Sequence, residues 1–551
     1  MEKVKIVISH QLSVIRRWIF NNRKEFYLLI LILLLGAFLR LYKIADYMTF
    51  LGDEGRDAII VRRLLVDFDP ILIGPRTSIG DMYLGPLYYY MMAPALLLAG
   101  FNPVGPAIMV ALLGAVTIFL VWYVARLWFG DNFNTSKLPK RVPCVGALIA
   151  AFLYSISPVV ITYSKSSWNP NIMPFFALLS ILGIWKVWFR QEFKWLIVVG
   201  VSMAFVLQSH YLGLLLLPTL GIFWTLTLFE IRNTKSETGK LIKYSFLAVV
   251  FFAFLMSPLV IFDARHYWRN FNSMKLFFTE RQSTISLKAW RGFPNTWPIF
   301  KDSFVTRIVS GKHLIIGKYT ALVLLLTAIC FIGIKLKKIF SILANLNIKN
   351  IKNEEARFIS GFIILVFWIF IGILGMSVYK QHIYDHYFGF LFPAPFLLIA
   401  GLSQIVYTKF ADGAKILLTA GIILLSVANI INTPIRYEPN YQMQRAINVS
   451  DLIREKAMGK MFNLAVIAER NYEDGYQYFL EKEEAKVVDI DPLRAEETIA
   501  NQLFVICELL QEQCDPTRNP KAEVANFGWS RIEGEWRVVE VTIYKLVHTE
   551  I

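Results

Sequence analysis

Apolar runs long enough to cross a bilayer recur through most of this 551-residue chain, and they constrain its fold more than any other feature. A helical span needs about 17 to 25 mostly apolar residues, and in lipid only helices or closed barrels satisfy every backbone polar group. Hydrophobic residues make up 56% of the chain and charged residues 18%, far from the composition of a soluble protein. We predict a mainly α, polytopic bundle of about eleven spans, at 26–42, 104–128, 143–162, 172–189, 195–209, 212–229, 244–262, 317–334, 358–378, 387–408 and 416–432.

A tyrosine-rich run, GPLYYYMMAPALLLAG at 85–100, decides how these spans are oriented. If this run crossed the membrane, the basic loops near 136–141, 232–243 and 335–357 would all lie outside, against the positive-inside rule. The run is short and contains two prolines, and tyrosines suit the membrane interface. We therefore predict an interfacial or re-entrant segment, a multi-pass protein of the cell membrane with a cytoplasmic N-terminus, and outer-face loops that include residues 43–103.

The composition changes near Tyr437. The stretches FNLAVIA, KVVDID, LFVICE and WRVVEVTIYKL predict strands, and QRAINVSDLIREKAMG predicts a helix between them. We expect a membrane domain at 1–432 and a small extracytoplasmic α/β domain at 433–551. The latter has no phosphate loop or nucleophile motif, which favours a docking or stabilising role. Its Cys507 and Cys514 are either a disulfide in an oxidising compartment or two unrelated buried thiols.

The net charge of +16 does not predict a nucleic-acid partner, because most Lys and Arg stand in short loops beside apolar runs. The most unusual polar stretch is GDEGRDA at 52–58, directly after the first span. Asp53 and Glu54 fit the first turn of an amphipathic helix, where the helix dipole favours acids. That explains the helix but not its place at the membrane edge.

The order of these features resembles family 39 of the GT-C membrane glycosyltransferases, which includes protein O-mannosyltransferases and the aminoarabinose transferase that modifies lipid A. The resemblance rests on Asp-Glu-x-Arg-x-Ala at 53–58 in the first outer loop, on Gly-Pro-Leu-Tyr-Tyr-Tyr at 85–90, and on the basic-capped helices that follow. It covers roughly the first 430 residues. The resemblance implies a GT-C bundle that moves a sugar from a polyprenyl-phosphate donor in the lipid bilayer to an acceptor lipid, glycan or protein.

The resemblance also implies that Asp53 is the catalytic base, with Glu54 supporting it. A single carboxylate makes chemical sense here. Hydrolysis of a glycosidic bond usually needs a second carboxyl group as general acid. A sugar linked to lipid phosphate departs from a phosphate, so one base and good phosphate stabilisation suffice. Direct displacement predicts inversion at the anomeric carbon.

The remaining candidate residues are placed by the same resemblance. Candidates for the donor or its phosphate are Arg56, Tyr88, His210, Lys380, His386 and Tyr387. Candidates for the acceptor or sugar are Trp168, Asn169 and Asp81. Each has a structural alternative: an intrahelical ion pair for Arg56, interfacial anchoring for the tyrosines, and a helix cap for His210.

No cofactor is predicted. The family often carries a carboxylate where this chain has Asn169, and an acid or histidine where it has Leu84, so few hard oxygen ligands for a divalent metal are evident. Asp81 is close enough in sequence to keep a metal site as an alternative.

Two other functions compete. A transporter or lipid-linked sugar flippase predicts ionisable residues inside the spans and internal repeats, whereas the predicted spans are nearly free of acids and show no repeat. A scaffold that presents the C-terminal domain needs no acidic cluster.

Overall fold

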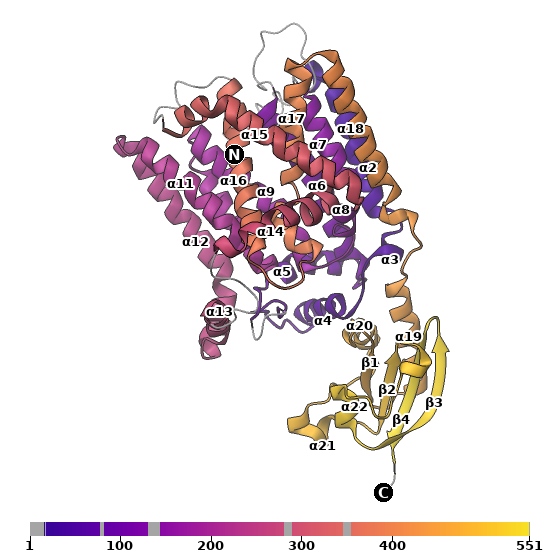
Figure 1. Ribbon diagram of the computed structural model, residues 1–551. Coiled ribbons are helices and arrows are strands. Elements are labelled where there is room, and N and C mark those ends of the chain that lie inside the picture. Colours follow the sequence, from indigo (N-terminus) through magenta and orange to yellow (C-terminus); the bar gives the residue numbers. More distant parts are fainter. Residues whose placement is uncertain are drawn as a thin grey trace.

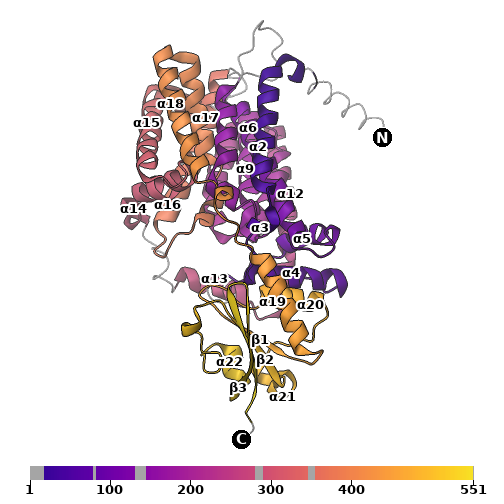
Figure 2. The ribbon, with the colours of Figure 1, turned by 90° about the vertical axis from the view of Figure 1, so that its right-hand side faces the viewer.

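A computed structural model describes residues 16, 18–77, 82–130, 144–279, 289–344 and 354–549. Figure 1 shows one bundle of long helices with a small sheet-containing domain attached at one end. The start of α2 lies at the opposite end of the bundle from that domain (Figure 2). The predicted fold class, a membrane helix bundle with a small C-terminal α/β domain, is confirmed.

Seven helical segments in the described part of the chain are long and apolar enough to span a membrane, and a bent pair brings the number to eight. The seven are α6 (Val104–Phe129), η1 with α9 (Asn169–Arg190), η2 with α11 (Tyr211–Ile231), α12 (Lys235–Arg265), Leu314–Leu343 within α15 (Leu314–Ala344), α16 (Glu354–Ser377) and α18 (Asp412–Ile431). The bent pair is η6 (Asp385–Leu391) and α17 (Ala394–Lys409), which meet at 52°.

The other three predicted spans are helices that are shorter or carry charges near their ends. They are α2 (Arg23–Leu41), α7 (Val145–Ile156) and α10 (Trp195–Ser209). A helix overlaps every predicted span, but the count of eleven crossings is not confirmed. The shorter elements of the bundle include α3 (Ile44–Tyr47), α4 (Gly52–Val66), α5 (Leu87–Leu98), α8 (Pro158–Thr162), α13 (Arg269–Thr279), η3 (Ala289–Arg291), α14 (Phe293–Pro298) and the π-helix η4 (Ile299–Val309).

The tyrosine-rich run forms α5, a helix of 12 residues that contains Pro94. At about 1.5 Å per residue it is too short for a hydrocarbon core of about 30 Å. Helices α5 and α4 lie together at the bundle end that faces the C-terminal domain (Figure 1). This position fits the predicted interfacial segment.

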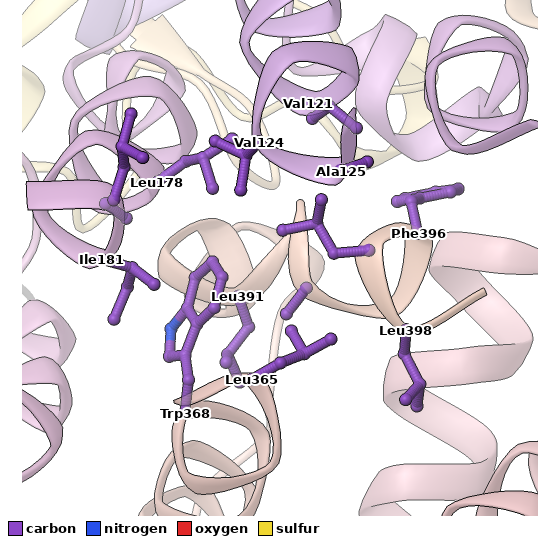
Figure 3. Packing of buried hydrophobic residues seen from close by; sticks show 14 of the residues in the cluster. Val121, Val124, Ala125, Leu178, Ile181, Leu365, Trp368, Leu391, Phe396 and Leu398 are labelled. Carbon is purple, nitrogen blue, oxygen red and sulfur yellow. The ribbon is translucent and has the colours of Figure 1, made fainter. Parts of the chain in front are cut away.

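Close packing of apolar side chains holds the bundle together, as expected in lipid, where helices associate by packing rather than by escape from water. Figure 3 shows α6, α9, α16 and the η6–α17 pair meeting in one core. The labelled contributors are Val121, Val124, Ala125, Leu178, Ile181, Leu365, Trp368, Leu391, Phe396 and Leu398. This core fixes the helix ends, and the polar residues described below stand on those ends.

The C-terminal domain has a four-stranded sheet in the order β1-β2-β4-β3. Strand β1 pairs parallel with β2, and β4 pairs antiparallel with both β2 and β3. The elements are α19 (Gln442–Ala457), β1 (Asn463–Ile467), α20 (Asp474–Lys482), α21 (Ala495–Thr498), β2 (Gln502–Cys507), α22 (Ala522–Phe527), β3 (Ser530–Val538) and β4 (Val541–His548). Cys507 and Cys514 form a disulfide.

Two strand predictions in this domain were wrong. The stretch KVVDID is not a strand, since only Val487 makes an isolated bridge, with Phe462. The stretch WRVVEVTIYKL is a hairpin rather than one strand, because the chain turns between β3 and β4 at Val539, whose φ is 56°. Tight hairpins usually have Asn or Gly at a position with positive φ, whereas this hairpin has Val539.

Candidate functional site

A cavity of about 450 Å³ lies among α4, the segment before α5, the starts of η1 and η2, α13 and the segment around η6. Its volume falls in the range of about 300 to 1,000 Å³ typical of ligand sites. The predicted site residues that line it are Asp53, Arg56, Trp168, Asn169, His210, His386 and Tyr387. Segments far apart in the sequence therefore bring most of the predicted residues to one cavity.

Helix α4 begins without a capping side chain of its own, because Leu51 stands at the N-cap position. Glu54 Oε2 accepts a hydrogen bond from the Leu51 N–H at 3.0 Å, as in half of a capping box. The Gly52 N–H donates to Asn471 Oδ1 of the C-terminal domain at 2.9 Å. The start of α4 is thus stabilised partly by a residue from the other domain.

Asp53 stands in the first turn of α4, with its side chain 44% exposed. Its Oδ1 accepts from Arg56 Nη1 at 2.8 Å and from the hydroxyl of Tyr472. Arg56 Nη1 also donates to the Tyr472 hydroxyl at 3.2 Å. Within the described residues, no hydrogen bond or ion pair involves Asp53 Oδ2. One oxygen of this carboxylate is held, and the other is available to a ligand in the cavity.

Arg56 also holds a second acid. Its Nη2 and Nε donate to Asp57 Oδ1 at 2.8 and 3.1 Å, and the Tyr89 hydroxyl donates to the same oxygen at 2.8 Å. Asp57 is completely buried, which raises the pKa of its carboxyl group, while Arg56 opposes the rise. Because both ends of the guanidinium are occupied, the geometry supports an orienting role for Arg56 more than a phosphate contact.

Glu54 does not line the cavity among the described residues. It is buried, and burial raises the pKa of its carboxyl group to about 7, against the opposing hydrogen bond from Leu51. Glu54 thus stabilises the first turn of α4, next to Asp53.

His210 is the C-cap residue of α10 and the N-cap residue of η2. It therefore caps a helix, and it also lines the cavity. Its Nδ1 accepts from the Leu212 N–H at 3.2 Å. Burial, and secondarily His386, lowers the pKa of His210 to about 3. The ring is therefore neutral at physiological pH, and its proton is assigned to Nε2 because Nδ1 is an acceptor.

Aromatic rings surround His210 and His386. The His386 ring lies 4.6 Å from the Trp168 ring and 5.9 Å from the His210 ring, and the Tyr387 ring lies 4.9 Å from that of His210. Asn169 is buried and donates from Nδ2 to the Ser209 carbonyl at 2.7 Å. These contacts join the loop after α8, the end of α10 and η6 into one wall.

Besides Glu54, two predicted residues do not line the cavity within the described part of the chain. The Tyr88 hydroxyl is buried and hydrogen-bonded to Ser167 Oγ at 2.7 Å, and Lys380 is exposed beside Tyr379, which does line the cavity. Asp81 lies outside the described residues. In the described part of the chain, no group of three or more His, Cys, Asp and Glu residues is placed to hold a metal ion.

Sequence reasoning missed four residues of the site. Asp57 was visible as the third acid of GDEGRDA, and Tyr89 was considered only with the other tyrosines of its run, not as a partner of Asp57. Arg76, a loop residue, lines the cavity without any sequence motif to mark it. Tyr472 belongs to the C-terminal domain, 419 positions from Asp53, and no sequence signal links the two.

Residues 84–262 match a family model described as dolichyl-phosphate-mannose-protein mannosyltransferase. The fold is similar to that of the oligosaccharyltransferase AglB from Archaeoglobus fulgidus, with a TM-score of 0.53 and 12% identity over 88% of this chain and 70% of that chain. It is also similar to ArnT from Cupriavidus metallidurans, with a TM-score of 0.51 and 13% identity over 94% of this chain and 97% of that chain. The chain therefore shares the fold of these membrane transferases, and its residues 84–262 match the mannosyltransferase family model. No curated protein sequence matches it.

The family match and the structural likeness cover different lengths of the chain. The family match begins at Leu84, so it includes the tyrosine run and His210 but not Asp53. The structural likeness extends over nearly the whole chain, yet at this identity it bears on the fold alone. The roles of individual residues therefore depend on the geometry of the cavity.

Proposed function

We propose that this GT-C protein transfers a sugar from a polyprenyl-phosphate-linked donor to an acceptor on the outer face of the cytoplasmic membrane, with Asp53 as the base. The observation that carries the proposal is the Asp53 carboxylate, with Oδ1 held by Arg56 and Tyr472, at the wall of a cavity at one end of a membrane bundle. Two structural relatives support the donor class. AglB was solved with a dolichol-phosphate and ArnT with undecaprenyl phosphate.

The reaction is a single displacement. The acceptor O–H gives its proton to Asp53 Oδ2 while the acceptor oxygen forms a bond to the anomeric carbon of the sugar. The bond from that carbon to the phosphate oxygen breaks, and its electron pair leaves with polyprenyl phosphate. Because a phosphate is a good leaving group, no general acid is required, and the configuration at the anomeric carbon inverts.

Other residues that line the cavity suit the departing phosphate. The neutral His210 ring offers an Nε2–H donor, and Arg76 adds positive charge. Apolar side chains such as Leu214 and Phe277 also line the cavity and suit the first isoprenes of the lipid. Donor groups placed where negative charge develops are usually the largest source of rate enhancement.

The outer face of the membrane is the side that fits this chemistry. The Cys507–Cys514 disulfide belongs to the domain that contacts the cavity residue Asp53, and disulfides persist in oxidising compartments. The start of α2, with Arg23 and Lys24, lies at the other end of the bundle, and the positive-inside rule assigns basic residues of this kind to the cytoplasmic side.

The test is sugar transfer by the purified full-length protein in proteoliposomes, offered polyprenyl-phosphate sugars or nucleotide sugars. We expect transfer from the lipid-linked donor alone, and an unchanged rate in EDTA because Asp53 Oδ1 and Glu54 Oε2 already have protein partners. Transfer from nucleotide sugars alone would contradict the donor class. A rate that EDTA abolishes and Mg²⁺ or Mn²⁺ restores would contradict the metal-independent reaction.

His210 is expected to act as a neutral hydrogen-bond donor to the phosphate. Replacing it with Ala should lower kcat/KM for the donor by about 10 to 100-fold, the usual loss for a hydrogen bond to a charged group. Gln, which keeps an N–H donor, should restore part of the loss. Since burial holds the pKa of His210 near 3, its protonation should not limit the rate between about pH 5 and pH 9. Wild-type activity in the Ala variant would contradict this role.

A further inference from the structure

We infer that the C-terminal domain forms part of the active site and that its Tyr472 is a positioning residue for Asp53. This inference rests on the proposed function, in which Asp53 is the base. Helix α20 lies beside α4 in both views of the molecule (Figures 1 and 2).

Two glycines of α4 make the close approach of the C-terminal domain possible. A Cβ atom at Gly52 would overlap the ring of Tyr472. A Cβ atom at Gly55 would overlap the backbone of Asp474 and the backbone nitrogen of Gly475. One turn of α4 therefore presents bare backbone to the start of α20, and the same turn carries Asp53.

The loop that carries Tyr472 is tied to the interior of its own domain. Asn471 Oδ1 accepts from the N–H groups of Gly52 and Tyr472, both at 2.9 Å. Asn471 Nδ2 donates to Glu508 Oε1 at 2.6 Å, and the Tyr476 hydroxyl donates to the same oxygen at 2.6 Å. Glu508 follows directly on the disulfide-bonded Cys507 at the end of β2. The position of the Tyr472 hydroxyl is thus set by the sheet.

Further contacts hold the two parts of the chain together away from the cavity. The Tyr478 hydroxyl donates to the Phe101 carbonyl at 2.6 Å. The Phe50 N–H donates to Gln442 Oε1 at 3.0 Å. Like the Tyr472 bond, these bonds join the two parts of the chain, but their acceptors are uncharged and neither bond involves Asp53.

The consequence for catalysis is geometric. Arg56 and Tyr472 both donate to Oδ1, from two different elements, so the Asp53 carboxylate is fixed in one orientation. Arg56 alone, three residues along the same helix, constrains the side chain less. A base must lie within hydrogen-bond reach of the proton that it removes, and small misplacements are costly. Loss of Tyr472 should therefore slow the chemical step without weakening donor binding.

The test compares Tyr472→Phe with Tyr478→Phe in the full-length protein. Both variants lose one hydroxyl of the same domain interface and keep the ring. We expect Tyr472→Phe to lower kcat about tenfold, the loss typical of a hydrogen bond to a charged group, with KM for the donor unchanged. Tyr478→Phe should keep kcat within about twofold of the wild type. Trypsin cleavage after Arg436, in the exposed linker before α19, reports in each variant whether the domain stays docked.

Each outcome decides the matter. Wild-type kcat in Tyr472→Phe, alongside an inactive Asp53→Asn protein, would overturn the inference and leave the proposed function standing. An active Asp53→Asn protein would instead overturn the proposed function. If both tyrosine variants loosen the domain and lose kcat equally, Tyr472 acts only through docking and the inference fails. A larger loss in Tyr472→Phe at equal trypsin sensitivity supports it.

Discussion

Asp53→Asn should reduce sugar transfer by about 10³-fold, within the range that general-base catalysis contributes. The substitution is nearly isosteric, and the amide oxygen of Asn still accepts from Arg56 and Tyr472, as Asp53 Oδ1 does now. What the variant lacks is a group that can take the proton of the acceptor. The measurement is the initial rate of transfer from a polyprenyl-phosphate sugar in proteoliposomes, with binding of the polyprenyl phosphate measured beside it.

The control is Asp67→Asn. Asp67 ends the same helix, is exposed and does not line the cavity. It makes the same change of charge on α4, so it separates the role of Asp53 from the loss of one negative charge. We expect transfer at the wild-type rate in Asp67→Asn and unchanged lipid binding in both variants. Full activity in Asp53→Asn would show that another group is the base.

The sequence predicts the membrane part of this fold well because lipid leaves the backbone few alternatives. An apolar run of sufficient length must form a helix, so the helices can be placed from hydropathy alone. The same logic predicts much of the site. Trp168, His210 and His386 each lie beside the end of a predicted span on the outer side, and span ends on one side of a membrane gather in space.

The tyrosine run shows where such reasoning stops. Successive residues on a helix point about 100° apart, so Tyr88, Tyr89 and Tyr90 cannot all face one site. Tyr88 bonds to Ser167, Tyr89 to Asp57 and Tyr90 to the Ile71 carbonyl. Only Tyr89 touches the acids of α4 through its hydroxyl, and the sequence does not reveal the rotation of the helix that selects it.

The contribution of the C-terminal domain was beyond prediction for a different reason. A domain interface is set by the shape of two surfaces, and it leaves no periodic pattern in either segment. The two glycines of GDEGRDA are part of this interface, although the sequence analysis explained only the charged residues of that stretch. Asn471 and Tyr472 lie in a polar loop after β1, where nothing marks them as partners of a membrane-domain helix.

Gly55→Ala should undock the C-terminal domain and lower transfer by about 100-fold, the scale of loss expected when a reacting group shifts by about 1 Å. The new methyl group would overlap backbone atoms of Asp474 and Gly475, which cannot turn aside as a flexible side chain can. Two effects oppose each other here. Ala favours the helix over Gly by about 1 kcal/mol, whereas overpacking against a rigid neighbour costs about 1 to 3 kcal/mol. The overlap with backbone places this site at the upper end of that cost, so the domain interface weakens.

The checks are the transfer rate and trypsin cleavage after Arg436, which should become faster as the domain leaves α4. Gly421→Ala in α18 is the matched control, because nothing lies within 4 Å of a Cβ there and the change in helix propensity is the same. We expect that variant to keep wild-type transfer and cleavage. A Gly55→Ala protein with faster cleavage but full transfer would mean that Asp53 works without the C-terminal domain. If both properties stay at wild-type values, α4 and α20 tolerate the added methyl group and the interface is less tightly packed than its geometry indicates.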